Sequence, residues 1–409
     1  MTTRLADGHR PIYLDHHAST PLDSAVLDAM MPYLTDKFGN ASSRTHAYGW
    51  EAEEAVHQAR EQVASLINAR PEEIVFTSGA TESDNLALKG IARGYRERGN
   101  HIITTTTEHR AILDACEALE AEGFDVTYVP VDRGGLVDPD DVRRAITPRT
   151  LLISVMYVNA EIGTIGPLAE IGAIAREHGV LFHSDAVQGV GKIACNVDDL
   201  GVDLMSISAH KIYGPKGIGA LYVRKTHPER IRLQPMIDGG GQERGLRSGT
   251  ANVPGIVGLG KACEVCQSQW ETEAIRLRGL RQRLHDGLTA RIDDVYLNGH
   301  AEPRLPGNLN LSFASVQGES LLLSMQHVAA LSAGSACSSG SNEPSYVLRA
   351  IGVGDLLANA SIRFGLGRST TAEDIDLVID ALVEKVGRLR ALAPTSKGRP
   401  FGSEPSVNR

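Results

Sequence analysis

The chain has few cysteines, few aromatic residues and no long apolar run. Its five cysteines are spread over 409 residues, unlike the dense, even-numbered cysteine framework of a small secreted protein. Aromatic residues make up 5% of the sequence, which argues against a surface that stacks nucleic-acid bases. No apolar stretch is long enough to span a bilayer, and residues 1–17 lack the apolar core of a signal peptide. We therefore expect reduced thiols and a cytoplasmic protein.

Positive charge is also scarce. Lys and Arg number 41 against 50 Asp and Glu, which gives a formal net charge of −9. The chain as a whole is therefore not attracted to nucleic-acid phosphates or to acidic membranes, and we expect no direct contact with either. The remaining composition, 42% hydrophobic and 22% charged, is that of an ordinary globular protein. The length predicts a large core with at least one smaller lobe.

Short β-branched runs alternate with helix-like segments from about residue 50 to residue 225. This alternation predicts an α/β architecture with a mainly parallel sheet flanked by helices. We expect strands at Glu73–Thr77, His101–Thr105, Leu151–Val158, Val180–His183, Asp203–Ser208 and Ala220–Val223. We expect helices between them at Ala52–Ile67, Glu82–Arg96, Ala111–Glu122 and Pro167–His178.

The pattern changes after about residue 264, where a smaller α+β domain is predicted. Its expected elements are a charged helix at Glu271–Ile292, a strand at Asn308–Phe313 and a last helix at Thr371–Leu392. The predicted domains are a large one at 19–264, a small one at 1–18 with 265–392 that carries a loop at about 330–345, and a flexible, Pro- and Ser-rich tail at 393–409.

Polar residues follow the ends of five predicted strands. In open α/β sheets, ligands bind outside the carboxyl ends of the strands. Each residue alone could be a loop residue that satisfies nearby backbone, but their convergence favours a binding site. They are Ser78–Glu82, Glu108–His109, Asn159, Asp185 with Gln188, and His210–Lys211.

Two of these strand ends indicate particular chemistry. The small residues of SGATES (78–83) let the backbone approach an anion, and Thr81-x-x-Asp84 is typical of a helix start; a phosphate site and a simple capped turn are both consistent with this segment. Lys211 follows an apolar run and precedes a glycine-rich turn. Partial loss of solvation would favour the neutral amine that a Schiff base needs, although an ordinary lysine that extends to solvent is the alternative.

Cysteines occur in two notable contexts. Cys337 lies in a run of small residues, LSAGSACSSGS (331–341), which is too poor in apolar bulk for a core element and suggests an exposed loop. An exposed thiol can become a thiolate nucleophile, and the residues alone leave nucleophile and structural thiol open. Cys263 and Cys266 form a CxxC in a helical-looking stretch without a second metal-binding pair nearby, which favours packing over metal binding.

Taken together, the motifs resemble the cysteine desulfurases of the NifS/IscS type, within the class V aminotransferase group of fold-type I pyridoxal-phosphate (PLP) enzymes. The similarity runs from Tyr13 to about Leu392 and includes FTSGATESDN, TEHRAILDAC, VNAEIG, HSDAVQ, SAHKIYGPKGIGALYV, GGGQERGLRSGT and SIRFGLGR. It implies the PLP-dependent transferase fold of type I and conversion of L-cysteine to L-alanine. The sulfur would pass to Cys337 as a persulfide and then supply iron–sulfur clusters, tRNA thiolation or other sulfur-containing cofactors.

The resemblance also implies roles for individual residues. Lys211 would bind PLP covalently, Cys337 would accept the sulfur, and His109 would stack on the cofactor ring and move protons. Further cofactor contacts would come from Ala80, Thr81, Asp185, Gln188, Ser208, His210 and, across a homodimer, Thr250 of the partner subunit. Asn159 and Arg363 would bind the substrate, with the guanidinium gripping its carboxylate as a fork.

Some positions depart from the family pattern. Tyr157, Ala160 and Ala209 replace residues that are common in the family, and we expect them to adjust the pocket without abolishing the chemistry. The tail Ser396–Arg409 does not resemble the segment with which housekeeping members dock an iron–sulfur scaffold.

The resemblance implies sulfur acceptors such as an iron–sulfur scaffold or a tRNA-thiolation sulfur carrier. It also suggests that Cys337 transiently ligates a 2Fe–2S cluster shared with such a scaffold. The competing interpretations are a related PLP enzyme, such as a selenocysteine lyase or an aminotransferase, and a sulfur-relay or scaffold-binding protein whose catalysis is secondary.

Overall fold

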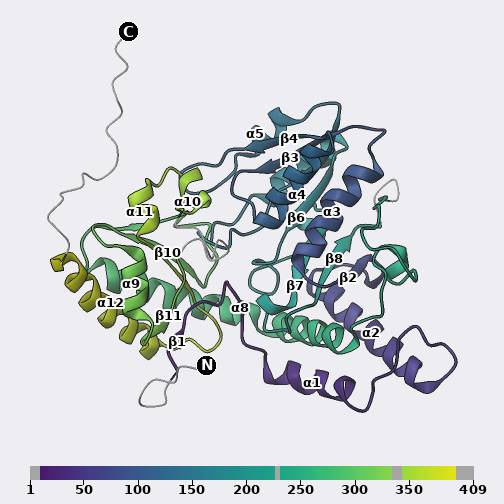
Figure 1. The fold of residues 1–409 in the computed structure, drawn as a ribbon, viewed down its shortest axis with the longest axis horizontal. Coiled ribbons are helices and arrows are strands. Elements are labelled where there is room, and N and C mark those ends of the chain that lie inside the picture. The colour runs from purple at the N-terminus through teal and green to yellow at the C-terminus, as the bar shows by residue number, and fades with distance from the viewer. Residues whose placement is uncertain (1–9, 226–230, 334–342, 393–409) are drawn as a thin grey trace, which may run out of the picture.

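The structure is a computed structural model that describes residues 10–225, 231–333 and 343–392. Its largest layer is a seven-stranded sheet with the order β2-β8-β7-β6-β5-β3-β4 (Figure 1). The strands are β2 (Ile74–Thr77), β3 (His101–Thr105), β4 (Asp125–Val129), β5 (Thr150–Ser154), β6 (Leu181–Asp185), β7 (Leu204–Ser208) and β8 (Gly219–Val223).

The sheet is mainly parallel, as predicted. Strands β3 to β7 run parallel to their neighbours, whereas β8 lies antiparallel between β7 and β2. Because β8 is reversed, β2 points the same way as β7. The carboxyl ends of six strands therefore meet at one edge of the sheet, which is where the sequence places its polar residues.

Helices cover both faces of this sheet (Figure 1). Helices α3 (Ala80–Gly94) and α4 (Arg110–Ala121) pack on one face, while α2 (Ala47–Leu66), α6 (Leu168–His178) and the first part of α8 (Val253–Thr289) pack on the other. Neighbouring strand residues face opposite cores: Ile102 packs under α3 and α4, whereas Ile103 packs under α2 and α6. This period of two is the expected geometry of a strand buried on both faces.

A smaller α+β layer follows in the chain. Its antiparallel sheet has the order β12-β10-β9, and a short parallel pair joins β1 to β11. The strands are β1 (Ile12–Tyr13), β9 (Val295–Leu297), β10 (Asn308–Phe313), β11 (Ala329–Ala330) and β12 (Ser361–Gly365). The β1 pairing joins the N-terminal segment to this layer, because Ile12 pairs with Ala329 far along the chain.

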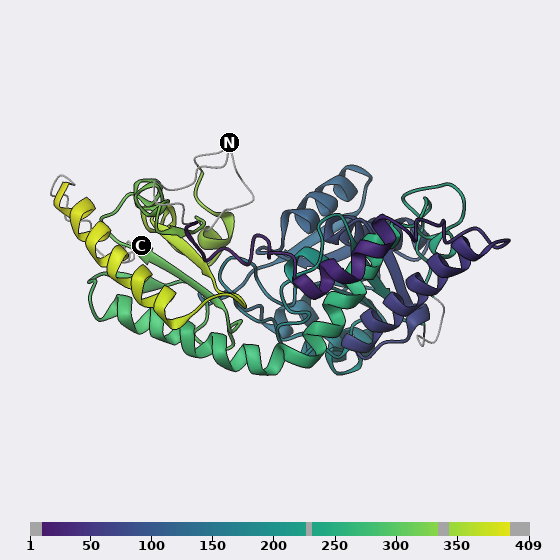
Figure 2. The same ribbon diagram turned by 90° about the horizontal axis from the view of Figure 1, so that it is seen from below.

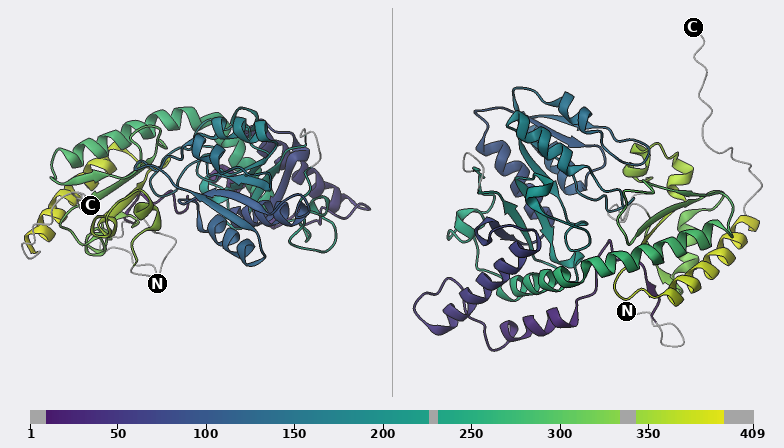
Figure 3. Two further views of the ribbon diagram at one scale, coloured as in Figure 1. Left: turned by 90° about the horizontal axis from the view of Figure 1, so that it is seen from above. Right: turned by 180° about the vertical axis from the view of Figure 1, so that it is seen from behind.

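Helices of the smaller layer share one core with its sheet. Leucines of α8, including Leu284, pack with residues of α9 (Gly318–Met325) and α12 (Ala372–Leu392). Figure 3 shows α12 lying along the second part of α8, which continues unbroken from the large sheet. The predicted charged helix at Glu271–Ile292 is thus the second part of this 37-residue helix. The other α-helices of the described residues are α1 (Ser24–Leu34), α5 (Pro139–Ala145), α7 (Val197–Leu200), α10 (Tyr346–Ala350) and α11 (Asp355–Asn359).

The CxxC of α8 is part of the core of the large layer. Cys263 and Cys266 are both buried among apolar side chains, which confirms the prediction of packing. Within residues 10–225, 231–333 and 343–392, no group of three or more His, Cys, Asp or Glu side chains is placed so that it could hold a metal ion. In the same residues, no helix combines the length and apolar character that crossing a bilayer requires.

Candidate active site

The carboxyl-end edge of the large sheet brings together the main polar residues that the sequence singles out. Asp185 ends β6, and Lys211 ends a short 3-10 turn directly after β7. His109 caps the N-terminus of α4 after β3, and its Nδ1 accepts a hydrogen bond of 3.1 Å from the Ala111 amide. Burial raises the pKa of Asp185, and the nearby His109 and Lys211 side chains both act to lower it. The three side chains therefore form one electrostatic unit.

Lys211 is fixed by the N-terminal segment. Its Nζ donates to the carbonyl oxygens of His17, at 2.6 Å, and Ala18, at 2.8 Å. The same segment is joined to the lysine turn by Thr20, whose Oγ1 donates to the His210 carbonyl and accepts from the Tyr213 amide. The sequence analysis missed this contribution. The polar residues that follow the short strand at Tyr13 could have indicated it, but we assigned this segment to the small domain.

Asp185 is suited to pair with a protonated ring nitrogen. Its carboxylate is only 7% exposed, and its Oδ1 accepts a hydrogen bond of 3.0 Å from the Val187 amide. Burial raises the pKa of Asp185, because a charged carboxylate loses hydration there. A cation against this group, such as a pyridinium, would offset that cost and keep the carboxylate ionised.

The N-terminus of α3 offers an anion site. No side chain caps this 15-residue helix at Gly79, and a side-chain carbon at Gly79 would meet no atom within 4 Å. Ala80 and Thr81 are its first residues, so their amides belong to the unpaired first turn. Ser208 and His210 reach the same edge from β7 and its turn. Burial, with nearby lysines, lowers the pKa of His210 to about 4, so it is a neutral group near pH 7.

These features fit PLP. The uncapped helix start can take its phosphate, Asp185 can pair with its ring nitrogen, and Lys211 can bind it covalently. The fit rests on the helix start and on the buried carboxylate of this chain.

The start of α3 differs from the predicted capping pattern. Thr81-x-x-Asp84 does not cap the helix, because Asp84 is fully buried beneath the sheet edge. Glu82 closes the turn instead: its Oε2 accepts from the Ser78 amide at 2.8 Å and its Oε1 accepts from Arg247 at 3.0 Å. The sequence pattern of a helix cap does not show whether the carboxylate binds the first amides of the helix or is buried in the core.

Two further buried carboxyl groups lie near Asp185. Burial and the charge of Asp185 raise the pKa of Asp84 well above its usual range, and burial raises the pKa of Glu108 to about 8. His183 beside them is neutral because burial lowers its pKa to about 3, and its nitrogens lie 2.9 and 3.1 Å from the hydroxyls of Ser154 and Ser206. A pKa of about 8 leaves Glu108 mainly protonated near pH 7, and burial shifts the pKa of Asp84 in the same direction.

Glu108→Gln should weaken the dependence of stability on pH. Oε1 of Glu108 accepts from the Thr105 hydroxyl and the Met156 amide, both at 2.8 Å, and the amide oxygen of glutamine can keep both bonds. An unfolded glutamate has a pKa of about 4.3, so between that value and about 8 the folded state binds more protons. The stabilisation from Glu108 is complete below the unfolded pKa and is lost as pH rises through about 8.

The measurement is the melting temperature at pH 6 and pH 9. The wild type should lose roughly 2 °C or more over this interval relative to Glu108→Gln. Glu53→Gln, at an exposed position of α2, is the matched control and should follow the wild type. Equal losses in all three proteins would contradict a buried, protonated Glu108.

Arg363 and Asn159 lie close to one another on the small-layer side of the site. Arg363 is 4% exposed; its Nη2 donates to Asp15 at 2.9 Å and its Nη1 donates to the Ala160 carbonyl at 3.3 Å. Its Nε–H has no hydrogen-bond partner in the described part of the chain. Arg363 thus reaches the site with a counter-ion and an unused donor.

Asn159 is occupied by backbone. Its Nδ2 donates to the Thr107 carbonyl at 3.0 Å, and its Oδ1 accepts from the amides of Glu161 and Ile162 at 2.9 and 3.0 Å. These bonds shape the loop after β5, and the role of Asn159 in substrate binding stays a prediction.

The other predicted residues have the following places. Gln188 follows β6, where its Nε2 donates to the His17 carbonyl at 2.9 Å, and Thr250 is exposed in the segment before α8. Cys337 lies outside the described residues, as do the centre of the predicted 330–345 loop and the tail 393–409.

The three departures from the family pattern have ordinary packing. Tyr157 is buried and its hydroxyl donates to the Ala194 carbonyl at 2.7 Å. Ala209 is fully buried in the core, and the Ala160 carbonyl accepts from Arg363. Their effect on the pocket stays a prediction.

Comparison with known proteins gives the family. The model of the family described as aminotransferase class-V matches residues 12–378. The chain belongs to this family. It is 56% identical over 384 residues to a cysteine desulfurase IscS of Anaeromyxobacter dehalogenans, with 94% of each chain covered. It is also 56% identical over 385 residues to a human cysteine desulfurase, covering 94% of this chain and 84% of the human one.

Solved structures of similar proteins agree with the fold. A NifS-like protein superposes with a TM-score of 0.85 at 38% identity, covering 93% of this chain and all of the other. SspA in complex with cysteine superposes with a TM-score of 0.78 at 41% identity, covering 87% and 98%. Class V aminotransferases and cysteine desulfurases are PLP-dependent, in keeping with the predicted fold-type I class.

Proposed function

We propose that this class V family member is a PLP-dependent cysteine desulfurase that converts L-cysteine to L-alanine and transfers the sulfur to Cys337 as a persulfide. One observation carries the proposal. Lys211, Asp185 and His109 converge beside the uncapped start of α3. The 56% identity to cysteine desulfurases supports the choice of substrate.

The site residues can divide the work of holding the cofactor. Lys211 would bind PLP covalently, the first amides of α3 with Ser208 and His210 would hold its phosphate, and Asp185 would keep its ring nitrogen protonated. PLP supplies an electron sink for negative charge at the substrate α-carbon. The His109 Nδ1 accepts a backbone hydrogen bond, so in the neutral ring the proton resides on Nε2, where it can be donated within the site.

Arg363 and Cys337 would handle the substrate. The guanidinium of Arg363, already oriented by Asp15, would bind the substrate carboxylate. The thiolate of Cys337 would attack the substrate sulfur, so that a sulfur–sulfur bond forms as the carbon–sulfur bond breaks. The electron pair of the broken bond stays with carbon, which takes up a proton and leaves as alanine.

We further propose a homodimer that uses the exposed apolar face around α1. Leu27, Met31 and Leu34 on α1 are 42 to 56% exposed, and Phe38 just after it is 71% exposed. Figure 2 shows α1 lying along the outside of α8, so its other side is uncovered. Exposed apolar patches of this kind mark interfaces. A second copy would bring Thr250 of the partner subunit toward the phosphate site.

The dimer has a direct test. Sedimentation should give a mass close to twice 43.8 kDa, and Leu34→Glu combined with Phe38→Glu should shift the protein toward the monomer. Leu377→Glu, at a position of α12 that is 59% exposed, should leave the mass unchanged. A wild-type monomer at micromolar concentration would contradict the proposal.

The sulfur would pass from Cys337 to acceptor proteins, such as an iron–sulfur scaffold or a tRNA-thiolation sulfur carrier, in the cytoplasm. Cys337 would also be the residue that transiently ligates a 2Fe–2S cluster on such a scaffold. These proposals rest on the resemblance and on the chemistry of a persulfide, which can supply several acceptors.

The activity is tested by incubating the purified protein, loaded with PLP, with L-cysteine. We expect equal amounts of alanine and of sulfide released by an added thiol. No alanine would contradict the proposal and favour a sulfur-relay role. Activity with selenocysteine but not cysteine would indicate a selenocysteine lyase, and amino-group transfer to a 2-oxo acid without sulfide would indicate an aminotransferase.

A further inference from the structure

A short chain of hydrogen bonds links Lys192 to Lys211 in the candidate site. Its Nζ donates to Oε1 of Gln188 at 2.7 Å, and Nε2 of Gln188 donates to the His17 carbonyl at 2.9 Å. The same carbonyl oxygen accepts a bond of 2.6 Å from Nζ of Lys211. One backbone oxygen thus joins the Gln188 amide to the lysine proposed to bind PLP.

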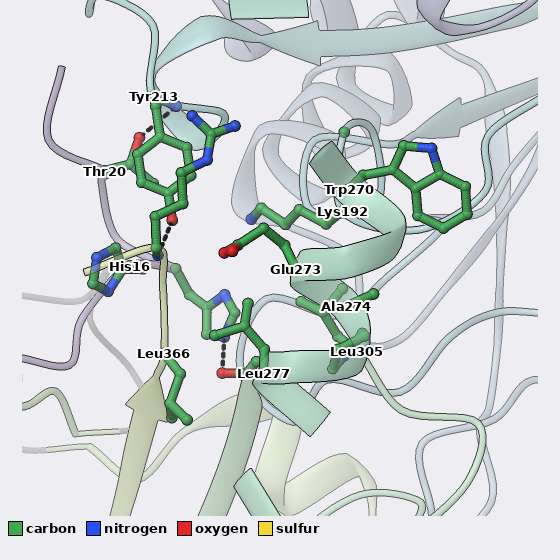
Figure 4. A pocket seen from close by; sticks show the side chains of 15 residues that line it. His16, Thr20, Lys192, Tyr213, Trp270, Glu273, Ala274, Leu277, Leu305 and Leu366 are labelled. Atoms are coloured by element: carbon green, nitrogen blue, oxygen red, sulfur yellow. Dashed lines mark hydrogen bonds between the residues drawn. The ribbon is translucent and has the colours of Figure 1, made fainter. Parts of the chain in front are cut away.

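Lys192 lines a pocket between the N-terminal segment and α8. Figure 4 shows the Lys192 side chain pointing into this pocket, with Glu273 and Trp270 on α8 and Tyr213 on the other side. In the described residues, Lys192 forms no ion pair with a carboxylate, although the carboxylate of Glu273 lines the same pocket. The amide oxygen of Gln188 is therefore the acceptor that holds the buried Lys192 amino group.

Several charged or titratable groups face Lys192. The charges of Lys211 and Arg363 disfavour its protonation, whereas a negative charge on Cys266 would favour it. The rings of His16 and His17 also lie within its field, because the charge of Lys192 lowers the pKa of each. Burial, followed by repulsion from Lys211, lowers the pKa of Lys192 to about 7.

The Lys192 amino group donates to Oε1 of Gln188. In its protonated form it has no acceptor to offer, whereas an amide has one end that accepts and one that donates. Lys192 therefore fixes which end of the Gln188 amide faces which way. With Oε1 on Lys192 and one Nε2 hydrogen on the His17 carbonyl, a flip of the amide would place two donors together and two acceptors together. Each mismatch would leave a buried polar group unpaired.

We infer that Lys192 is a positioning residue, which locks the amide of Gln188 so that its second N–H faces the bound cofactor. This inference rests on the proposed function, in which Gln188 contacts the ring hydroxyl oxygen of PLP. The donor would stabilise negative charge on that oxygen. It would thereby lower the pH at which the visible absorption band of the loaded protein loses its proton.

The test is a pH titration of that absorption band. In Lys192→Met, we expect the midpoint to rise by about 1 pH unit, because a donor and a nearby positive charge are both lost. Lys192→Gln keeps a donor for the Gln188 oxygen without the charge, so it should recover part of the shift. Lys261→Met, at a surface ion pair with Glu264, is the matched control and should titrate as the wild type does.

A double-mutant cycle tests whether Lys192 acts through Gln188. If it does, Gln188→Leu combined with Lys192→Met should shift the midpoint no further than Gln188→Leu alone. Additive shifts, or Lys192→Gln titrating like Lys192→Met, would show a through-space charge effect and overturn the positioning role. If Lys192→Met does not fold, Lys192→Gln is compared with Lys261→Gln. A through-space charge effect predicts the full rise of about 1 pH unit in Lys192→Gln, whereas the positioning role predicts a smaller rise.

This test and that of the proposed function fail in different ways. A wild-type band without alanine formation would remove the desulfurase proposal and leave the role of Lys192 measurable in the titration. A midpoint unchanged in every Lys192 variant would remove the positioning role while the desulfurase activity stands. Absence of any band in the wild type with added PLP would overturn both.

Discussion

Lys211→Ala should lack the visible absorption band of the PLP-loaded wild type and should form alanine from cysteine about 10³-fold more slowly, or not detectably. The lysine Nζ is held at 2.6 and 2.8 Å from the carbonyls of His17 and Ala18, so it is fixed in place at the strand edge. In the described residues, no other lysine lies within three residues after a strand that ends at this edge. An added small amine can replace its chemistry only in part, because it lacks this fixed position.

The matched control is Lys225→Ala. Lys225 also follows a strand, β8, but that strand is antiparallel to β7, so Lys225 lies at the opposite edge of the sheet. The variant should keep the band and the rate. Loss of activity in Lys211→Ala with an unchanged band would place the covalent link elsewhere. Loss of both in Lys225→Ala as well would indicate a general effect on folding.

The sequence could predict the buried strands and the sheet edge at which Lys211 lies. Runs such as HIITT and DLMSIS are continuous and β-branched, so they predict buried strands, and the residues after them predict a site at one edge. All six expected strands of the large sheet are present. The edge strand β4, DVTYV, was missed because it is partly exposed and carries polar residues among its apolar ones.

The rest of the site depends on contacts between distant parts of the chain. The His17 carbonyl, which accepts from Lys211 and Gln188, is a backbone atom and has no signature in a side-chain pattern. The inward turn of Asp84 is set by packing of α3 on the sheet, and local spacing predicted a cap there. Asp15 is paired with Arg363 across almost the full length of the chain, and no local pattern relates the two residues.

The second large effect is expected from the thiol of Cys337. The pKa values of the four other cysteines explain this expectation. Burial raises the pKa of Cys116 and Cys195 to about 12, and burial also raises the pKa of Cys263 and Cys266. A thiol with so high a pKa is almost entirely protonated near pH 7, and the thiolate is the nucleophile. The raised pKa disfavours the thiolate form of all four, which supports the proposal that Cys337 is the nucleophile.

Cys337→Ala should keep the visible band of the loaded protein, because the residues proposed to hold PLP are unchanged. Without an added thiol, its release of sulfur from cysteine should fall by about 10²-fold or more, since the group that accepts the sulfur is gone. Protein incubated with cysteine, freed of small molecules and then treated with a reductant should release sulfide from the wild type and none from the variant. Cys195→Ala removes a thiol with a raised pKa and should behave as the wild type in all three measurements.

Full sulfur release by Cys337→Ala without an acceptor thiol would contradict the persulfide role and indicate a lyase that needs no protein thiol. Lys211→Ala would still be inactive in that case, because either reaction needs the lysine-bound cofactor.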